Sequence, residues 1–260
     1  MKFDFSVPMT FYEFLAILLA AIAIIIPIAQ AIWNKWILHT ELKFYPTGRA
    51  ILFYNQSGSY IRIDGVCEAI HKAISVKKIN LKVTRKKDEA KLNLSWSSFI
   101  SPVNQNMIGA YVQTTEAAHP FRIESDSIMC TFMEFGDMFD TFGKDFRLNT
   151  NDLFSEIPEI KENCSDYSQA SMIYIQKKEY ADAKDFLAKE LFWKIGKYIV
   201  EIEVEYNNTS KKFTYEISVA ENDFKSLSDN FDEALLSPLK SVYGIPWNYR
   251  TVIVELQNVK

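Results

Sequence analysis

The chain has 260 residues, a formal net charge of −4 at pH 7 and only eight glycines. An acidic balance without aromatic and basic stacking motifs argues against a nucleic-acid-binding protein, because phosphate would be repelled. The three cysteines are far apart in the sequence and form no Cys-x-x-Cys pair, so nothing indicates a disulfide framework or a zinc site. A reducing compartment fits this cysteine pattern best.

The most informative segment is an uncharged run that covers residues 14–34. A helix of about 20 apolar residues crosses a bilayer core of roughly 30 Å. Trp33 and Trp36 stand at the end of the run, as is typical of a membrane interface. We therefore predict a single-pass transmembrane helix over 14–36, which follows a short extracytoplasmic leader, 1–13.

Basic residues in the flanks set the predicted orientation. Lys2 stands alone before the span, whereas Lys35, Lys43 and Arg49 follow it closely. Because cations remain on the cytoplasmic side of a membrane, we expect the amino terminus outside, the large domain in the cytoplasm and membrane lipid as a partner.

A cleaved signal peptide is the alternative interpretation of the same run. The triplet Ala29-Gln30-Ala31 follows Pro27 and resembles a processing site. Cleavage there would make the protein an exported binding protein. The leader lacks the positive region that secretion signals need, and this favours an uncleaved signal anchor.

Three residues inside the span bear on helix packing. Ala16 and Ala20 form a small-xxx-small pair that lets two helices approach closely, and Pro27 frees a backbone carbonyl and can kink the helix. They permit an effector whose helices act on the bilayer when the domain oligomerises. Incidental spacing of alanines is the commoner explanation of the pair.

Beyond the span, the apolar spacing changes from helical to alternating. This alternation indicates half-buried antiparallel strands and is found at Ile61 and Ile63, at Ile79, Leu81 and Val83, and at Leu92, Leu94 and Trp96. The clearest hairpin joins 198–206 to 213–219. The preceding segment, 193–198, resembles the strand entries of immunoglobulin-like sandwiches. This architectural resemblance implies a mainly β protein, with an antiparallel β-sandwich over 37–220 and two or more added helices.

The helices are expected late in the chain. An amphipathic stripe predicts one helix over 177–193 and another over about 223–236, with Pro238 as its stop. A terminal strand over 251–256 completes a C-terminal helix and strand unit, 221–260. Between residues 102 and 170 no period dominates, and only short strands near 121–124 and 128–135 are expected.

Basic residues concentrate between Lys77 and Lys91. The favoured interpretation is that they form the solvated faces and turn of a hairpin. The alternative is attraction to anionic lipid, which is worth about 1 kcal/mol for each cation close to the membrane surface.

The strongest chemical candidate is an acidic and aromatic stretch within an expected insertion around 134–166. Clustered carboxylates can hold calcium or act as acid and base, but the spacing here does not match a calcium loop. The phenylalanines between them indicate a surface loop that is pinned to the core. We expect a partner-binding or ligand-binding loop whose carboxylates are Glu134, Asp137, Asp140 and Asp145.

No catalytic, cofactor-binding or metal-binding residue is predicted. The histidines share no ligand spacing, and the chain lacks the nucleophile elbow, phosphate loop, zinc-protease and dinucleotide motifs. The favoured function is a membrane-tethered, noncatalytic interaction or sensor module that engages a protein partner or a second copy of itself. The alternatives are a membrane-anchored hydrolase that uses the acidic-loop carboxylates, and the exported binding protein.

Overall fold

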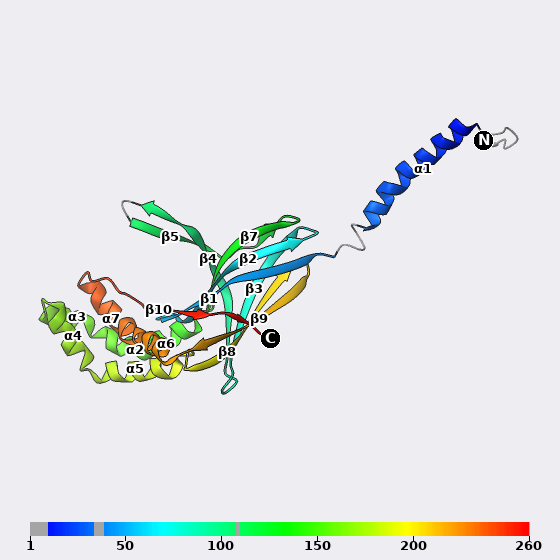
Figure 1. Ribbon diagram of the computed structural model, residues 1–260. Helices are drawn as coiled ribbons and strands as arrows, with labels where there is room; N and C mark the ends of the chain where they lie inside the picture. The colour runs from blue at the N-terminus through cyan, green and yellow to red at the C-terminus, as the bar shows by residue number, and fades with distance from the viewer. Residues whose placement is uncertain (1–9, 34–38, 108–109, 260) are drawn as a thin grey trace.

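A computed structural model describes residues 10–33, 39–107 and 110–259 of the protein (Figure 1). The strands are β1 (Glu41–Asn55), β2 (Gly58–Ile70), β3 (Ile74–Arg85), β4 (Lys91–Met107), β5 (Ala110–Ala117), β6 (Phe121–Ile123), β7 (Ser127–Gly136), β8 (Gly196–Tyr206), β9 (Thr209–Val219), β10 (Thr251–Glu255) and β11 (Gln257–Asn258). The helices are α1 (Phe11–Ile32), α2 (Thr141–Ser155), α3 (Ile157–Asn163), α4 (Tyr167–Ile175), α5 (Lys178–Glu190), α6 (Glu221–Ser228) and α7 (Asn230–Val242).

Helix α1 is an isolated apolar helix of 22 residues. It begins with a capping box: the Thr10 hydroxyl accepts from the Glu13 amide, and the Glu13 carboxylate accepts from the Thr10 amide at 2.8 Å. None of its residues is buried, and its length and apolar composition suffice to cross a membrane. This confirms an apolar spanning-length helix with Pro27 inside it. The predicted boundary at Trp36 and leader residues 1–9 lie outside the described residues.

The strands form one antiparallel sheet in the order β10-β1-β2-β7-β4-β3-β8-β9-β11, with β5 paired to β4 and β6 to β3. Its two edge strands are consecutive in the chain, because only Leu256 separates β10 from β11. The sheet therefore curves until its edges nearly meet, and it has almost the shape of a barrel. This confirms the mainly β, antiparallel prediction. The immunoglobulin-like sandwich is not confirmed, because the described strands join one sheet rather than two facing sheets.

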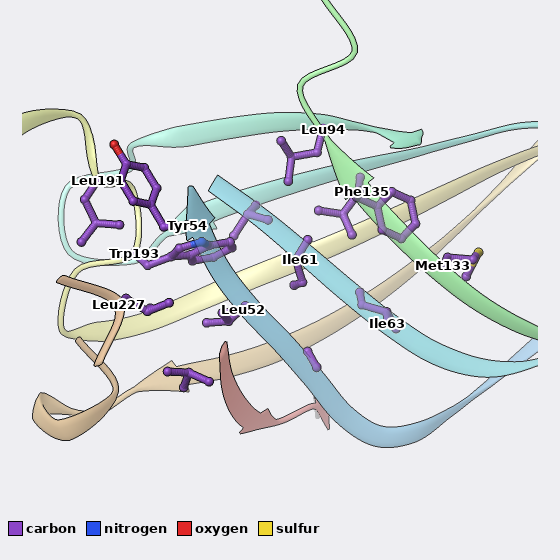
Figure 2. Close-up of a cluster of buried hydrophobic side chains, with 14 of the residues drawn as sticks. Leu52, Tyr54, Ile61, Ile63, Leu94, Met133, Phe135, Leu191, Trp193 and Leu227 are labelled. Atoms are coloured by element: carbon purple, nitrogen blue, oxygen red, sulfur yellow. The ribbon is translucent and has the colours of Figure 1, made fainter. Parts of the chain in front are cut away.

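The core fills the inside of this curved sheet (Figure 2). Alternate residues on each strand point inward, as the period of two requires. At one end the aromatic ring of Trp193 and the side chain of Leu227 cover the interior, and both are fully buried. Each such apolar side chain contributes about 1.5–3 kcal/mol by leaving water. The inward set that Figure 2 labels on the strands is Leu52, Tyr54, Ile61, Ile63, Leu94, Met133 and Phe135.

The helices other than α1 gather at the end of the sheet that carries the β1–β2 turn (Figure 1). The Gln56 side-chain amide donates to the Ala234 carbonyl at 2.8 Å, and the Asn230 amide donates to the Tyr54 carbonyl at 3.0 Å. Asn230 is 1% exposed. These bonds tie α7 to the turn by satisfying buried carbonyls.

Two helix predictions need correction in detail. The helix expected over 177–193 is α5, which ends at Glu190, but the one expected over 223–236 is divided at Asp229 into α6 and α7. Pro238 lies inside α7 and does not end it. The segment without a dominant period contains α2, α3 and the start of α4. These helices have 15, 7 and 9 residues, and the shorter two have too few turns for a clear helical period in the sequence.

Two neighbouring residues of β10 allow a matched test of how the closure of the sheet contributes to stability. Val254 is 5% exposed and faces the core, whereas its neighbour Ile253 is 61% exposed. We expect Val254→Ala to lower the free energy of unfolding by about 2 kcal/mol, and Ile253→Ala to change it by no more than about 0.5 kcal/mol. Urea unfolding of the full chain in detergent measures both. Equal effects would contradict the inward placement of Val254.

Candidate functional site

The two ends of the sheet differ in their distance from α1. The chain enters β1 at Glu41, whereas the basic β3–β4 turn lies at the opposite end of β3, a strand of 12 residues that spans roughly 40 Å. Surface charges are screened over about 8 Å at physiological salt. Lys86 and Lys197 both pair with Glu216 on β9, and their hydrogen bonds lower the pKa of Glu216 to about 2. The geometry favours a solvated hairpin over a lipid-binding cluster.

Asp137 in the acidic loop begins helix α2. Its carboxylate accepts hydrogen bonds from the amides of Phe139 at 3.0 Å, Thr141 at 2.6 Å and Phe142 at 3.1 Å. These amides include the first donors of α2, which have no partner inside the helix. Asp137 therefore serves as the side-chain cap of α2, four residues before the helix begins at Thr141.

The other carboxylates of the acidic stretch have separate surroundings. Asp140 has a left-handed backbone with φ of 53° and pairs with Arg147 at 2.6 Å. Glu134 lies on β7, where burial raises the pKa of its carboxyl and the charge of Arg62 opposes that shift. Asp145 is exposed on α2. In the described part of the chain, no group of three His, Cys, Asp or Glu residues is placed to hold a metal ion.

The loop nevertheless forms one wall of a groove. This groove, of about 500 Å³, runs over the outer face of β3, β4, β8 and β9, beside the residues that lead into α2. We call it the strand-face groove. Its polar lining is Asn80, Lys82, Asn93, Ser95, Glu201, Glu203 and Lys212, and its loop wall is Gly136, Asp137, Met138, Phe139 and Thr141.

The strand register places the polar residues of the groove in two cross-strand rows. Asn80 on β3 stands opposite both Ser95 on β4 and Glu203 on β8. Two residues further along β3, on the same face, Lys82 stands opposite both Asn93 and Glu201. Paired residues of antiparallel strands project to the same side. The rows therefore present hydroxyl, amide, ammonium and carboxylate groups to one space.

The charged groups of the two rows balance one another, and the one further carboxylate of the groove, that of Asp137, accepts hydrogen bonds from three backbone amides. Lys82 Nζ lies 3.3 Å from a Glu201 carboxylate oxygen, and Lys212 Nζ lies 3.9 Å from one of Glu203. The Ser210 hydroxyl also donates to Glu203 at 3.2 Å. Two lysines beside two glutamates give the rows no net charge. Such a surface suits a neutral ligand with several donors and acceptors better than a phosphate or a polycation.

The loop wall adds an apolar surface beside these polar rows. Phe139 is 79% exposed and Met138 is 57% exposed. Large apolar side chains that remain in water next to a polar concavity are typical of binding sites. The ring of Phe139 can cover the apolar face of a ligand whose edges bond to the strand residues.

A second recess of about 390 Å³ lies on the other side of the start of α2. It shares Asn93, Leu94, Asp137 and Thr141 with the strand-face groove. Asp145 contributes to its lining, together with Glu190 and Phe192. The first turn of α2 therefore separates two concave surfaces, and Asp137 holds that turn in place.

The sequence predicts a binding loop at this position, and the binding itself stays a prediction. The sequence emphasised the carboxylates, of which only Asp137 lines the strand-face groove. The available signal is the polar residues that alternate with the apolar ones along these half-buried strands, such as Asn80, Lys82 and Asn93. Their convergence depends on the register between four strands, which alternation within one strand does not specify.

Comparisons with known proteins supply no family. No protein-family model matches the chain, and no curated protein matches it. A solved structure of a family 123 glycoside hydrolase from Clostridium perfringens, described in work on glycolipid glycan hydrolysis, matches with a TM-score of 0.29 and 8% identity. The match covers 68% of this chain and 26% of that one, so the chain spans about a quarter of its length. A likeness this weak carries no functional argument.

The cap of α2 can be tested by comparing two loop carboxylates. We expect Asp137→Ala to lower the free energy of unfolding by about 1–2 kcal/mol, because three amides lose their acceptor. Asp140→Asn should cost less than about 0.5 kcal/mol, since it removes an exposed ion pair and asparagine tolerates a left-handed backbone. Urea unfolding measures both variants. Indistinguishable midpoints would refute the capping role.

Proposed function

We propose that the protein is a membrane-tethered, noncatalytic sensor module in which α1 crosses the bilayer once and the strand-face groove binds a small, neutral, polar ligand. The observation that carries the proposal is the groove itself, where two in-register polar rows meet the exposed ring of Phe139. The predicted orientation places the amino terminus outside and the groove in the cytoplasm. Tethering confines ligand-dependent encounters to the membrane surface and raises effective concentration.

Two of the four loop carboxylates are already engaged by other groups of the protein, and this supports binding rather than hydrolysis. Asp137 has three amide partners and Asp140 has an arginine partner. A general acid or base must be free to exchange a proton with a substrate. In the groove, Glu201 and Glu203 each stand beside a lysine, at 3.3 and 3.9 Å.

The output of the module is proposed to be association with a protein partner or with a second copy of the chain. Ala16 and Ala20 lie one helical turn apart on α1, which has no buried residue of its own. Pro27 adds a position where the helix can bend. Ligand binding at the groove would then alter the association of the tethered domains.

Two substitutions to lysine near the middle of α1 test the membrane anchor. Each cation at a helix centre costs about 2.5–3.5 kcal/mol of insertion free energy, so Ile22→Lys with Ile25→Lys should release the chain from carbonate-washed membranes. Ile22→Val with Ile25→Val is the control and should float with the membranes. Protection of the domain from added protease shows on which side of the membrane it lies. A mature wild-type chain that begins just after Ala31 would instead establish the exported alternative.

Substitutions of two apolar residues with nearly equal exposure test the groove. Phe139 lines the groove and is 79% exposed, whereas Leu148 lies on α2 outside it and is 77% exposed. We expect native mass spectrometry of the full chain in detergent, incubated with a deproteinised metabolite extract, to show a bound small molecule.

Phe139→Ala should weaken binding of that molecule about tenfold, a loss of about 1.4 kcal/mol, and Asn80→Ala should weaken it further. Leu148→Ala should bind like the wild type. The proposed site is wrong when the wild type retains no small molecule, or when Phe139→Ala and Asn80→Ala bind it unchanged.

A further inference from the structure

A second surface of the sheet is apolar and lies at the end where the chain arrives from α1. Among the strand side chains that the structure describes, only three large hydrophobic residues are exposed: Tyr45 at 50%, Ile128 at 67% and Ile253 at 61%. Tyr45 and Ile128 belong to one patch, whereas Ile253 lies on β10, opposite Ile51 in the half of β1 near the helices.

The register of β1, β2 and β7 defines this patch. Tyr45 pairs with Val66, which pairs with Cys130, so these three side chains stand in one row on the outer face. The adjacent rows contribute Ile128 and Phe132 from β7. We call these five residues the anchor-end patch. The side chains between them, such as Cys67 and Thr131, point into the core and are buried.

The anchor-end patch lies within reach of a membrane that holds α1. Residues 33–40 separate the end of α1 from β1, and eight residues extend at most about 29 Å. In the row nearest the chain entry, Ile128 pairs with Glu68, which pairs with Lys43, only two residues after the start of β1. A bilayer that contains α1 would therefore be close to this end of the sheet.

The polar groups around the patch indicate which membrane surface it suits. The Tyr45 hydroxyl donates to Glu68 at 2.9 Å, which raises the pKa of the tyrosine and leaves its ring against solvent. Asp64 pairs with Arg62 at 2.8 Å. Lys43 is the cation in the Ile128 row. With charges of both signs and no basic excess, the patch is suited to the headgroup region of zwitterionic lipid rather than to anionic lipid.

We propose that the anchor-end patch rests on the bilayer interface, so that the domain is held against the membrane by Tyr45, Ile128 and Phe132 as well as by its helix. This inference rests on the proposed membrane tether. The interfacial preference of tyrosine and the cost of leaving large aliphatic side chains in water both favour this contact. Such a contact fixes the tilt of the sheet and hence the direction in which the strand-face groove opens.

A native cysteine in the patch allows this contact to be measured by site-specific labelling. Cys130 is exposed within the patch, whereas Cys67 and Cys164 are 1% and 2% exposed. An environment-sensitive fluorophore should therefore label Cys130 selectively in the folded full chain. The labelled chain is placed in phosphatidylcholine nanodiscs with or without lipids that carry a quencher near the headgroup. The control carries Cys130→Ser with Ile253→Cys, which moves the label to the other exposed position.

We expect quenching at Cys130 to exceed quenching at the control position at least threefold. A further substitution, Ile128→Asp, should reduce the Cys130 signal to the control level, whereas Ile253→Asp should leave it unchanged. Thermal unfolding shows that each variant is folded. Equal quenching at both positions, or no effect of Ile128→Asp, overturns the inference. Co-elution of the chain with the nanodiscs separately tests the tether, so a failed tether is distinguished from a failed patch.

Discussion

The fold depends on one short segment that pairs with both edges of the sheet. Residues of β10 bond to β1 and residues of β11 bond to β9, and the amide of Leu256 between them donates to the Gly48 carbonyl at 2.9 Å. Val252, Val254 and Leu256 are nearly fully buried on the inside of this seam. Without it, β1 and β9 would each present a row of unpaired backbone groups and one side of the core would be open to water.

Closure of the sheet determines where chemistry can occur. The interior is filled with apolar side chains, and Trp193 and Leu227 cover it at the end that faces the helices. A filled interior leaves no ligand cavity inside a small barrel. Polar side chains must therefore gather on the outer wall, where their neighbours are set by strand pairing. The strand-face groove arises in this way, and the start of α2 supplies its rim.

The sequence predicted the elements whose pattern is local. Alternation identified the strands around Ile61, Leu81 and Leu94, and the uncharged run identified α1. Sheet closure was not predictable, because the pairing of Arg49 with Glu255 joins residues that share no local pattern. For the same reason, the resemblance of 193–198 to a sandwich strand entry did not reveal how many sheets the strands would form. Trp193 instead lies buried at the end of the curved sheet.

The sequence identified the acidic loop but not the structural roles of its carboxylates, and binding by this loop stays a prediction. The acidic loop does border the groove, yet Asp137 is engaged by the amides of α2 and Asp140 by Arg147. A carboxylate just before a helix has this structural use as readily as a chemical one. The capping use became visible only with the helix boundary, which lacked a clear periodic signal in the sequence.

Closure by the last strands also has a kinetic consequence. Contacts between residues some 200 positions apart are slow to form, because a long loop must be ordered before the contact contributes any stability. Until then, β1 and β9 are exposed edges, and strand edges of neighbouring chains can pair with them. The proposed anchoring of α1 in a bilayer would concentrate such half-closed chains in two dimensions. The seam is thus the step at which folding of this protein competes with intermolecular strand exchange.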